Sequence, residues 1–259
     1  MPSVEIDDPV WKWRTRLKKE VYERKKYLRL SDDALSELIT KRTILSTNYD
    51  TRVSLDFPHF CAGASLGCGG PKGWCYTFQG ALARDAHHKK VAFNDATCLR
   101  LPEKLSVKIV SEISSAVAAG TLKYPNLRFN GSGEATSHHV PVLKRLVELG
   151  VQVWGFSKNI QILPKLRDAG VSVMYSYDRT TSIEDVDRAV KNNFSLAYTS
   201  VGVKDFPLRG AKVVFPLHRS GHVKEVVDSQ ALCPKVIDEY LNQKRSPGYC
   251  QTKCNRCHN

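Results

Sequence analysis

The sequence predicts an α/β protein built on a partial (β/α)6 barrel, and two observations lead to this fold class. Apolar, β-rich runs alternate with short amphipathic helical segments through residues 126–218. These runs begin near residues 127, 151, 171, 194 and 212, which is a nearly regular spacing. Such alternation is typical of a parallel sheet of βα units. With "TRVSLDF" at residues 51–57 as the first strand, six units result, which can form an open or partial barrel.

The first fifty residues are predicted to form a basic helical extension. Between Trp11 and Leu30, nine of twenty residues are Lys or Arg, interleaved with four aromatic residues. This helix can bind a phosphate backbone, or it can simply cap the domain. A second helix is expected after Ser31, a good N-cap residue that is followed by two aspartates.

Residues 51–225 are assigned to the barrel. Residues 89–95 ("KKVAFND") are expected to be a short strand and residues 101–120 a helix ending at Gly120. The remaining expected strands are "NLRF", "VQVWGFS", "VSVMYSYD", "FSLAYTSVG" and "AKVVFPLH", and the helices between them are "HHVPVLKRLVELG", "NIQILPKLRDAG" and "SIEDVDRAVKNN". Residues 226–259 form a cysteine-rich tail.

Composition points to a cytoplasmic globular protein with no membrane segment. The chain has 259 residues, of which 42% are hydrophobic and 25% charged, and no apolar run approaches the ~20 residues of a membrane span. The first residues lack the apolar stretch of a signal peptide. In the cytosol, eight cysteines favour metal binding or redox chemistry over disulfides. The net charge of +13 favours a polyanionic partner such as nucleic acid, or it only keeps the surface soluble.

The first cysteine group, Cys61, Cys68 and Cys75, lies in a glycine-rich loop directly after the first predicted strand. Three thiolates suit a [4Fe–4S] cluster with one iron left open for a ligand. A closed zinc site needs a fourth ligand, for which His59, His87, His88 and Cys98 are candidates. The cysteines can also be incidental buried residues. We expect the cluster, with Cys98 left as a buried structural thiol.

The second cysteine group comprises Cys233, Cys250, Cys254 and Cys257 in the tail. Four thiolates can close a second [4Fe–4S] cluster or a structural zinc site, and His258 can replace one of them. A full set of four ligands indicates a structural, electron-relay or substrate-anchoring role.

Polar residues follow several predicted strands, and in parallel α/β folds chemistry gathers at such strand ends. The turn formed by Gly131, Ser132, Gly133 and Glu134 can let a ligand approach the backbone, with the carboxylate accepting hydrogen bonds from an ammonium group, although tight turns often contain glycine for steric reasons alone. At the start of the next helix, His138 and His139 are expected to act at the helix cap rather than as metal ligands.

Taken together, these motifs resemble the radical SAM superfamily. In that family a three-cysteine loop after the first barrel strand holds [4Fe–4S], and an aromatic residue precedes the last cysteine, as Trp74 does here. The resemblance implies that Gly131, Ser132, Gly133 and Glu134 replace the family's "GGE" turn at the methionyl amino group of S-adenosylmethionine. It also implies that Ser176 and Asp178 contact the ribose.

Residues 51–259 look more closely similar to the phage gene-product-88-like proteins. The shared features are "CAGASLGCGGPKGWCY", "LRFNGSGE", "WGFSK" and the tail "LCPK…CQTKCNRC". The usual radical SAM spacing, C-x3-C-x2-C, occurs in this tail instead of the first loop. Because a C-terminal position is typical of auxiliary clusters, we assign the catalytic cluster to the first loop.

The predicted function is a radical-SAM-type iron–sulfur enzyme. The cluster on Cys61, Cys68 and Cys75 would cleave S-adenosylmethionine to a 5′-deoxyadenosyl radical that abstracts hydrogen from a small molecule or a nucleic acid. Electrons would come from a reductant such as flavodoxin or ferredoxin. Lys158 and His218 would contact substrate or the S-adenosylmethionine carboxylate, or they are solvated rim residues. The alternative is a nucleic-acid-binding metalloprotein in which both cysteine groups are structural.

Overall fold

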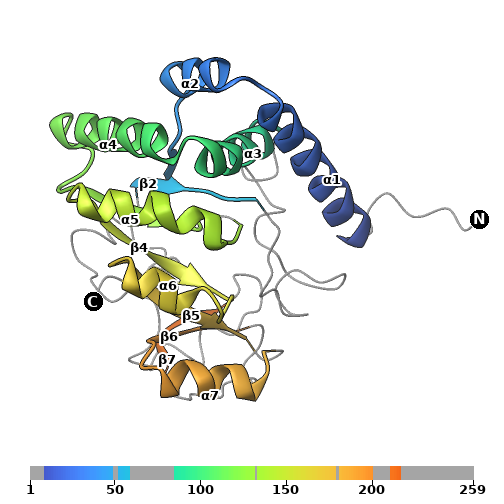
Figure 1. Cartoon of the computed structure of the whole chain (residues 1–259). Helices are drawn as coiled ribbons and strands as arrows, with labels where there is room; N and C mark the ends of the chain where they lie inside the picture. The colour runs from blue at the N-terminus through green and yellow to red at the C-terminus, as the bar shows by residue number, and fades with distance from the viewer. Residues whose placement is uncertain are drawn as a thin grey trace, which may run out of the picture.

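The computed structural model describes residues 9–48, 52–58, 85–131, 133–178, 181–200 and 211–216. Of residues 9–17, 48, 52, 200 and 213–216 it describes the backbone alone. The described residues form an α/β fold around one seven-stranded sheet in which the strands lie in chain order from β1 to β7 (Figure 1). Strand β1 pairs antiparallel with β2, and each later strand is parallel to the one before it. The predicted α/β class and the six consecutive parallel strands are therefore confirmed.

From β3 onward the elements follow the predicted order along the chain. The strands are β1 (Ser46–Asn48), β2 (Arg52–Leu55), β3 (Asn126–Phe129), β4 (Gln152–Ser157), β5 (Ser172–Tyr177), β6 (Leu196–Ser200) and β7 (Ala211–Pro216). The helices are α1 (Pro9–Leu28), α2 (Asp32–Lys41), α3 (Asp85–Arg100), α4 (Pro102–Ala118), the 3-10 helix η3 (Ser137–His139), α5 (Val140–Glu148), α6 (Leu163–Asp168) and α7 (Ile183–Lys191). Among these described helices, none is long and apolar enough to cross a bilayer.

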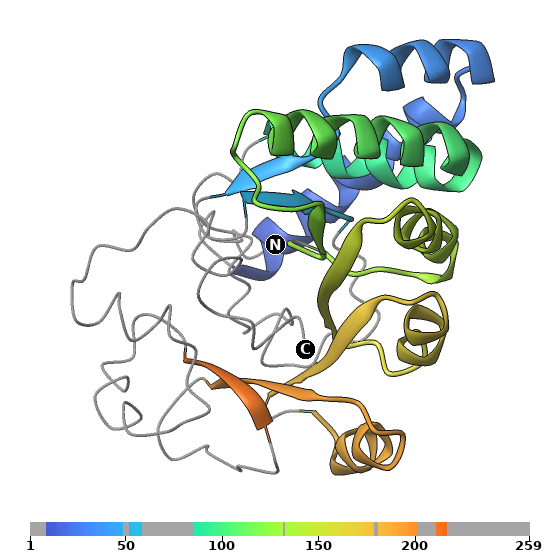
Figure 2. The same ribbon diagram turned by 90° about the vertical axis from the view of Figure 1, so that its left-hand side faces the viewer.

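Helices α5, α6 and α7 lie side by side on one face of the sheet (Figure 2). The alternation of side chains along each strand explains this arrangement. Leu127, Phe129 and Val153 belong to the larger hydrophobic core, which also contains residues of α2 to α5. Tyr175 and Tyr177 pack in a second core with residues of α6 and α7. The intervening residues of these strands therefore lie on the opposite face.

The basic helix α1 is fixed to the domain along one face, which packs against α3. At successive helical turns, the carboxylate of Glu20 meets the His88 ring at 2.8 Å, Arg24 pairs with Asp95, and Tyr27 is buried. This i, i+4, i+7 spacing places the three side chains on one stripe of the helix. For this stripe, the packing fits the alternative in which α1 caps the domain. The predicted N-cap of α2 is also confirmed, because the Ser31 hydroxyl accepts a hydrogen bond from the N–H of Ala34.

Two local predictions are wrong. Residues 89–95 were expected to be a strand, but they lie inside α3. Every residue from 91 to 98 is buried. A short helical segment that is buried all round has no solvent-exposed face, so its periodicity does not distinguish it from a buried strand. Residues 46–48, expected to belong to a helical extension, form β1, which the pairing with β2 stabilises.

Candidate functional site

The candidate site lies at the carboxyl ends of β2 to β5, where the end of β2 is in very close contact with the turn after β3. The N–H of Glu134 donates to the carbonyl of Pro58 at 3.3 Å. A Cβ atom on Gly133 would lie 1.9 Å from the carbonyl oxygen of Phe57, and Gly133 has a φ of +75°. A Cβ atom on Gly131 would lie 2.4 Å from a carboxylate oxygen of Asp56. Both glycines are therefore required by this contact between chain segments.

The carboxylate of Glu134 joins the ends of β3 and β4. One oxygen accepts from the Asn130 amide at 3.0 Å and from the N–H of Ala135 at 3.2 Å, while the other accepts from the N–H of Lys158 at 3.0 Å. Burial raises the pKa of Glu134 to about 7, although the hydrogen bonds from Lys158 and from the Ser157 hydroxyl act in the opposite direction. Through these internal hydrogen bonds the Glu134 side chain stabilises the site, in addition to any contact it makes with a ligand.

The next two strand ends are connected by a buried ion pair. The ammonium group of Lys158, after β4, lies 2.6 Å from a carboxylate oxygen of Asp178, after β5. The backbone N–H of Asp178 also donates to the hydroxyl of Thr181. Ser176 is half-buried and lies two residues before Asp178, on the same face of β5. Four residues assigned from the sequence, Gly133, Glu134, Lys158 and Asp178, are thus linked by direct contacts or by backbone connection.

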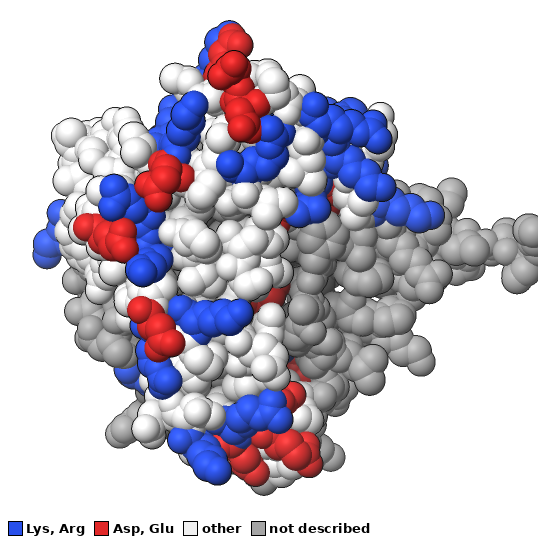
Figure 3. Space-filling view, in the orientation of Figure 1, with Lys and Arg blue, Asp and Glu red and all other residues white. Residues whose placement is uncertain are grey.

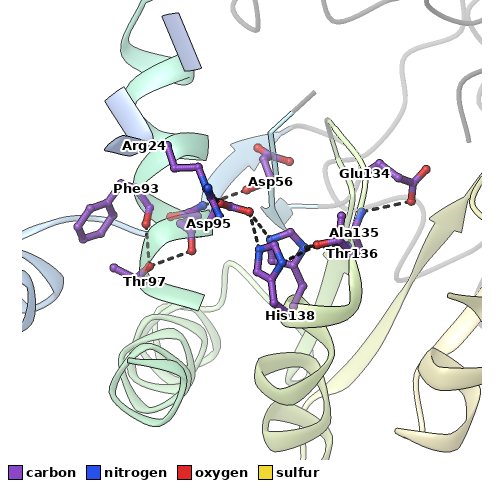
Figure 4. A network of polar contacts seen from close by, with 11 residues as sticks. Arg24, Asp56, Phe93, Asp95, Thr97, Glu134, Ala135, Thr136 and His138 are labelled. Carbon is purple, nitrogen blue, oxygen red and sulfur yellow. Dashed lines mark hydrogen bonds and ion pairs between the residues drawn. The ribbon is translucent and has the colours of Figure 1, made fainter. Parts of the chain in front are cut away.

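A second polar group lies beside the first and centres on Asp95 of α3 (Figure 4). One carboxylate oxygen of Asp95 contacts Nε2 of His138 at 2.7 Å and Nε2 of His139 at 2.8 Å, and the other contacts Arg24. Burial opposes ionisation of Asp95, but these three partners hold its pKa well below the usual range. The His139 ring stacks on Phe57, with ring centroids 3.8 Å apart. The Asp95 cluster, defined as Arg24, Asp95, His138 and His139, therefore packs against the end of β2.

The Asp95 cluster has the residue types of a metal site, and the ligand atoms of Asp95, His138 and His139 lie within 4.8 Å of one another. The hydrogen bonds argue against a metal in this arrangement. The N–H of Thr136 points at Nδ1 of His139 at 2.9 Å, so that nitrogen must be an acceptor. A neutral ring then carries its proton on Nε2, which leaves no Nε2 lone pair for a metal. This bond at the start of η3 confirms the predicted capping role of His139.

The ligand sets predicted from cysteine lie outside the described residues, as do Ser132 and His218. Cys98 is described; it is 2% exposed, and burial raises the pKa of its thiol well above the ordinary value. The prediction of a buried thiol is therefore confirmed. His88, a candidate fourth ligand, is buried and bonded to Glu20.

Three residues of the site region were not singled out from the sequence. Asp95 was missed because its segment was assigned to a strand. Asn130 has a φ of +54°, and an asparagine directly after a strand is the available signal for such a turn. Arg128 stands within β3 on the face opposite α5, where its guanidinium lies over the rings of Trp154 and Phe156. A charged residue inside a predicted buried strand was the signal for Arg128.

Comparisons of the chain with protein-family models, with curated proteins and with solved structures found no match.

The contact of Gly133 with Phe57 predicts a large difference between two glycine substitutions. Gly133→Ala should lower the free energy of unfolding by roughly 3–5 kcal/mol, because a left-handed φ and a backbone clash act together. Gly120→Ala is the matched control, since Gly120 has a φ of +68° but nothing within 4 Å of its Cβ position. It should cost about 1 kcal/mol. Urea unfolding followed by circular dichroism measures both, and equal losses would show that the contact is absent.

The Asp95 cluster predicts a pH dependence of stability. Burial lowers the pKa of His139 to about 4, from an ordinary value of 6.5, despite the Asp95 partner. Between pH 6.5 and 4, His139 is therefore protonated in the unfolded chain but stays neutral in the folded protein. The free energy of unfolding falls as pH falls through this window, by about 3 kcal/mol in all.

The check is urea unfolding of the wild type and of His139→Gln at several pH values. Glu134 changes the free energy of unfolding in the opposite direction over an overlapping pH range, because its pKa is raised. Both proteins contain Glu134, so the difference between their free energies of unfolding reports on His139. The difference should shrink as pH falls. A constant difference, or a His139 imidazole NMR signal that titrates near pH 6.5, would contradict the assignment.

Proposed function

We propose that this chain is a radical-SAM-type iron–sulfur enzyme on a partial (β/α)6 barrel, with the catalytic [4Fe–4S] cluster on Cys61, Cys68 and Cys75. The observation that carries the proposal is the contact between the end of β2 and the turn at Gly133 and Glu134. It joins the start of the cysteine loop to the turn that the resemblance assigns to S-adenosylmethionine.

Chain length strengthens this link. Cys61 follows Pro58 by three residues, and three residues span at most about 11 Å. The carbonyl of Pro58 is bonded to the N–H of Glu134, so a cluster held by Cys61 would be confined to the neighbourhood of the turn. A cluster on the loop and a ligand on the turn would therefore be neighbours, as reductive cleavage of S-adenosylmethionine requires.

The described residues fit a polar ligand placed across the strand ends. Glu134 would hold the turn and the start of the β4 loop in register through its hydrogen bonds to Ala135 and Lys158. Asp178 would present a carboxylate to the ribose hydroxyls, with Ser176 beside it, and Lys158 would balance the carboxylate charge. Ser132, Gly131 and His218 complete the proposed set.

When bound and reduced, the cluster would supply the electron that splits S-adenosylmethionine into methionine and a 5′-deoxyadenosyl radical. Residues 226–259 would hold an auxiliary cluster or a zinc ion on Cys233, Cys250, Cys254 and Cys257, outside the barrel of residues 51–225. A flavodoxin or ferredoxin would be the reductant.

Anaerobic purification followed by iron, sulfide and zinc analysis tests the proposal. The purified chain should contain at least four iron atoms per chain, and it should form 5′-deoxyadenosine when S-adenosylmethionine and dithionite are added. Protein that contains only zinc would overturn the proposal. If the protein contains iron but forms no 5′-deoxyadenosine, the result would support the cluster and contradict the radical chemistry.

A matched pair of cysteine variants assigns the two sites. Cys75→Ala should abolish 5′-deoxyadenosine formation and the first cluster while the tail keeps its metal. Cys254→Ala should empty the tail and leave the iron of the first loop in place. Loss of all metal in Cys75→Ala would contradict two independent sites.

The outer face of α1 favours a second function, contact with nucleic acid. Away from the stripe that packs on α3, Lys18, Lys25 and Lys26 are exposed, and Figure 3 shows Lys and Arg gathered along this helix. Lys19 is also exposed, but it pairs with Asp85 of α3, and the exposed Arg29 directly follows the helix. Tyr22, in the same region, is 61% exposed, and the Lys26 ammonium lies 4.4 Å from its ring centre. An exposed aromatic ring among cations suits single-stranded nucleic acid.

Fluorescence anisotropy with a labelled single-stranded DNA tests this second function. Binding should weaken at least tenfold between 50 and 200 mM salt. Replacing Lys18, Lys25 and Lys26 with Gln should weaken it at least tenfold at 50 mM salt. The control changes the same charge elsewhere, at the exposed Lys104, Lys144 and Lys191. If both triple variants lose the same affinity, α1 is not the binding face and net charge alone explains the binding.

A further inference from the structure

We propose that Arg128, together with Trp154 and Phe156, forms a binding site for an anionic group on the sheet face that α5, α6 and α7 leave uncovered. The anion is a carboxylate or a phosphate carried by the substrate. The proposal rests on the proposed function only in calling the ligand a substrate, because the site itself is argued from the described residues.

The sheet register brings these side chains onto one face. Arg128 is paired with Ser54 of β2 and with Trp154 of β4, and Trp154 is paired with Ser172 of β5. Side chains at paired positions of parallel strands point the same way. Because Leu127, Phe129 and Val153 pack in the core with α5, Arg128 and Trp154 point away from these helices.

The side chain of Arg128 is half-buried. Its Nε atom is buried and makes no hydrogen bond, and among the described residues no carboxylate pairs with the guanidinium. Within this part of the chain the group contacts the two rings, whose centres lie 5.9 Å and 5.5 Å from its central carbon. A half-buried cation with an unsatisfied donor destabilises a fold, and removing one partner of a buried ion pair typically costs several kcal/mol. An anion bound at Arg128 would remove this cost.

The geometry selects the ligand chemistry. A cation–π contact uses the charge of the guanidinium and none of its N–H donors, which lie in the plane of the group and stay available for hydrogen bonds. A carboxylate or a phosphate can accept two of them at once. The residues paired with Arg128 on β2 and with Trp154 on β5 are the small Ser54 and Ser172, which limits steric conflict with a bound anion.

The position also suits a substrate. Arg128 precedes Asn130, at the strand end, by two residues, which corresponds to about 7 Å along a strand. On β4, Phe156 lies between Trp154 and Lys158 on the same face. A substrate whose anionic group binds Arg128 would therefore extend toward the strand ends, where the proposed radical is generated. The site predicts an acidic substrate that is longer than its anionic group.

Thermal unfolding of the full-length protein in phosphate, acetate or chloride at equal ionic strength tests the inference. The wild type should gain stability with phosphate or acetate in a saturable way, and the more effective anion identifies the headgroup. Arg128→Met keeps the contact with the rings and removes the charge. It should weaken the apparent affinity for the anion at least tenfold, and its midpoint in chloride should equal or exceed that of the wild type.

Arg167→Met is the matched control, because Arg167 also lies over an aromatic ring, that of Phe194, but is exposed. It should respond to anions like the wild type. If Arg128→Met does not fold, Arg128→Lys should still show the weakened response, since an ammonium group lacks the planar fork. An unchanged anion response in the Arg128 variants, no response in the wild type, or loss of iron in Arg128→Met would overturn the inference. Formation of 5′-deoxyadenosine by the wild type tests the proposed function, whereas the anion response is read from unfolding midpoints, so the two proposals are judged separately.

Discussion

The ion pairs and hydrogen bonds of Asp95 connect more of this structure than any other interaction among the described residues. The buried carboxylate binds Arg24 of α1, and it also binds His138 and His139 at the start of α5. An unpaired carboxylate at this depth would cost several kcal/mol, so the three partners must be held together once Asp95 is buried. Because His139 also stacks on Phe57, the constraint extends to the end of β2. The N-terminal helix thereby becomes part of the support of the strand ends, and it is more than a basic appendage.

The strand ends are fixed by a second set of contacts that depend on backbone groups. Gly133 admits the carbonyl of Phe57, and Glu134 collects donors from β3 and β4. The cost of burying the Glu134 carboxylate appears as its raised pKa, and the donors around it limit that cost. A site built in this way is held by contacts within the protein that require no ligand. Such preorganisation reduces the entropy lost on binding and suits a polar cofactor that must be held in one orientation.

The sequence predicted the regular part of the fold well, because alternating strands and amphipathic helices leave a strong period in residues 126–216. The turn with Gly131, Gly133 and Glu134 could also be located, since its residue types stand out after a strand. The role of the two glycines could not be predicted, because they accommodate β2 and the residues that follow it, more than seventy residues earlier in the chain. The Asp95 cluster was equally hidden, because its members come from three separate elements and residues 91–98 of α3 have no exposed face that would reveal a helix. Contacts of this kind depend on tertiary packing, which local patterns do not encode.

The charges along the sheet face opposite α5, α6 and α7 differ in how they are balanced. Lys158 and Asp178 neutralise each other, and Glu134 is surrounded by donors and has a pKa near neutrality. Arg128 has aromatic partners, and no described residue gives it an anionic one. A guanidinium loses less by desolvation than an ammonium group would, which explains how the fold tolerates an arginine in the middle of a strand. Its charge is thus not balanced within the part of the chain that the structure describes, and an uncompensated group in an otherwise satisfied region is where a binding site is expected. The paired groups at the strand ends would then hold the cofactor. Arg128, within β3, would bind the substrate.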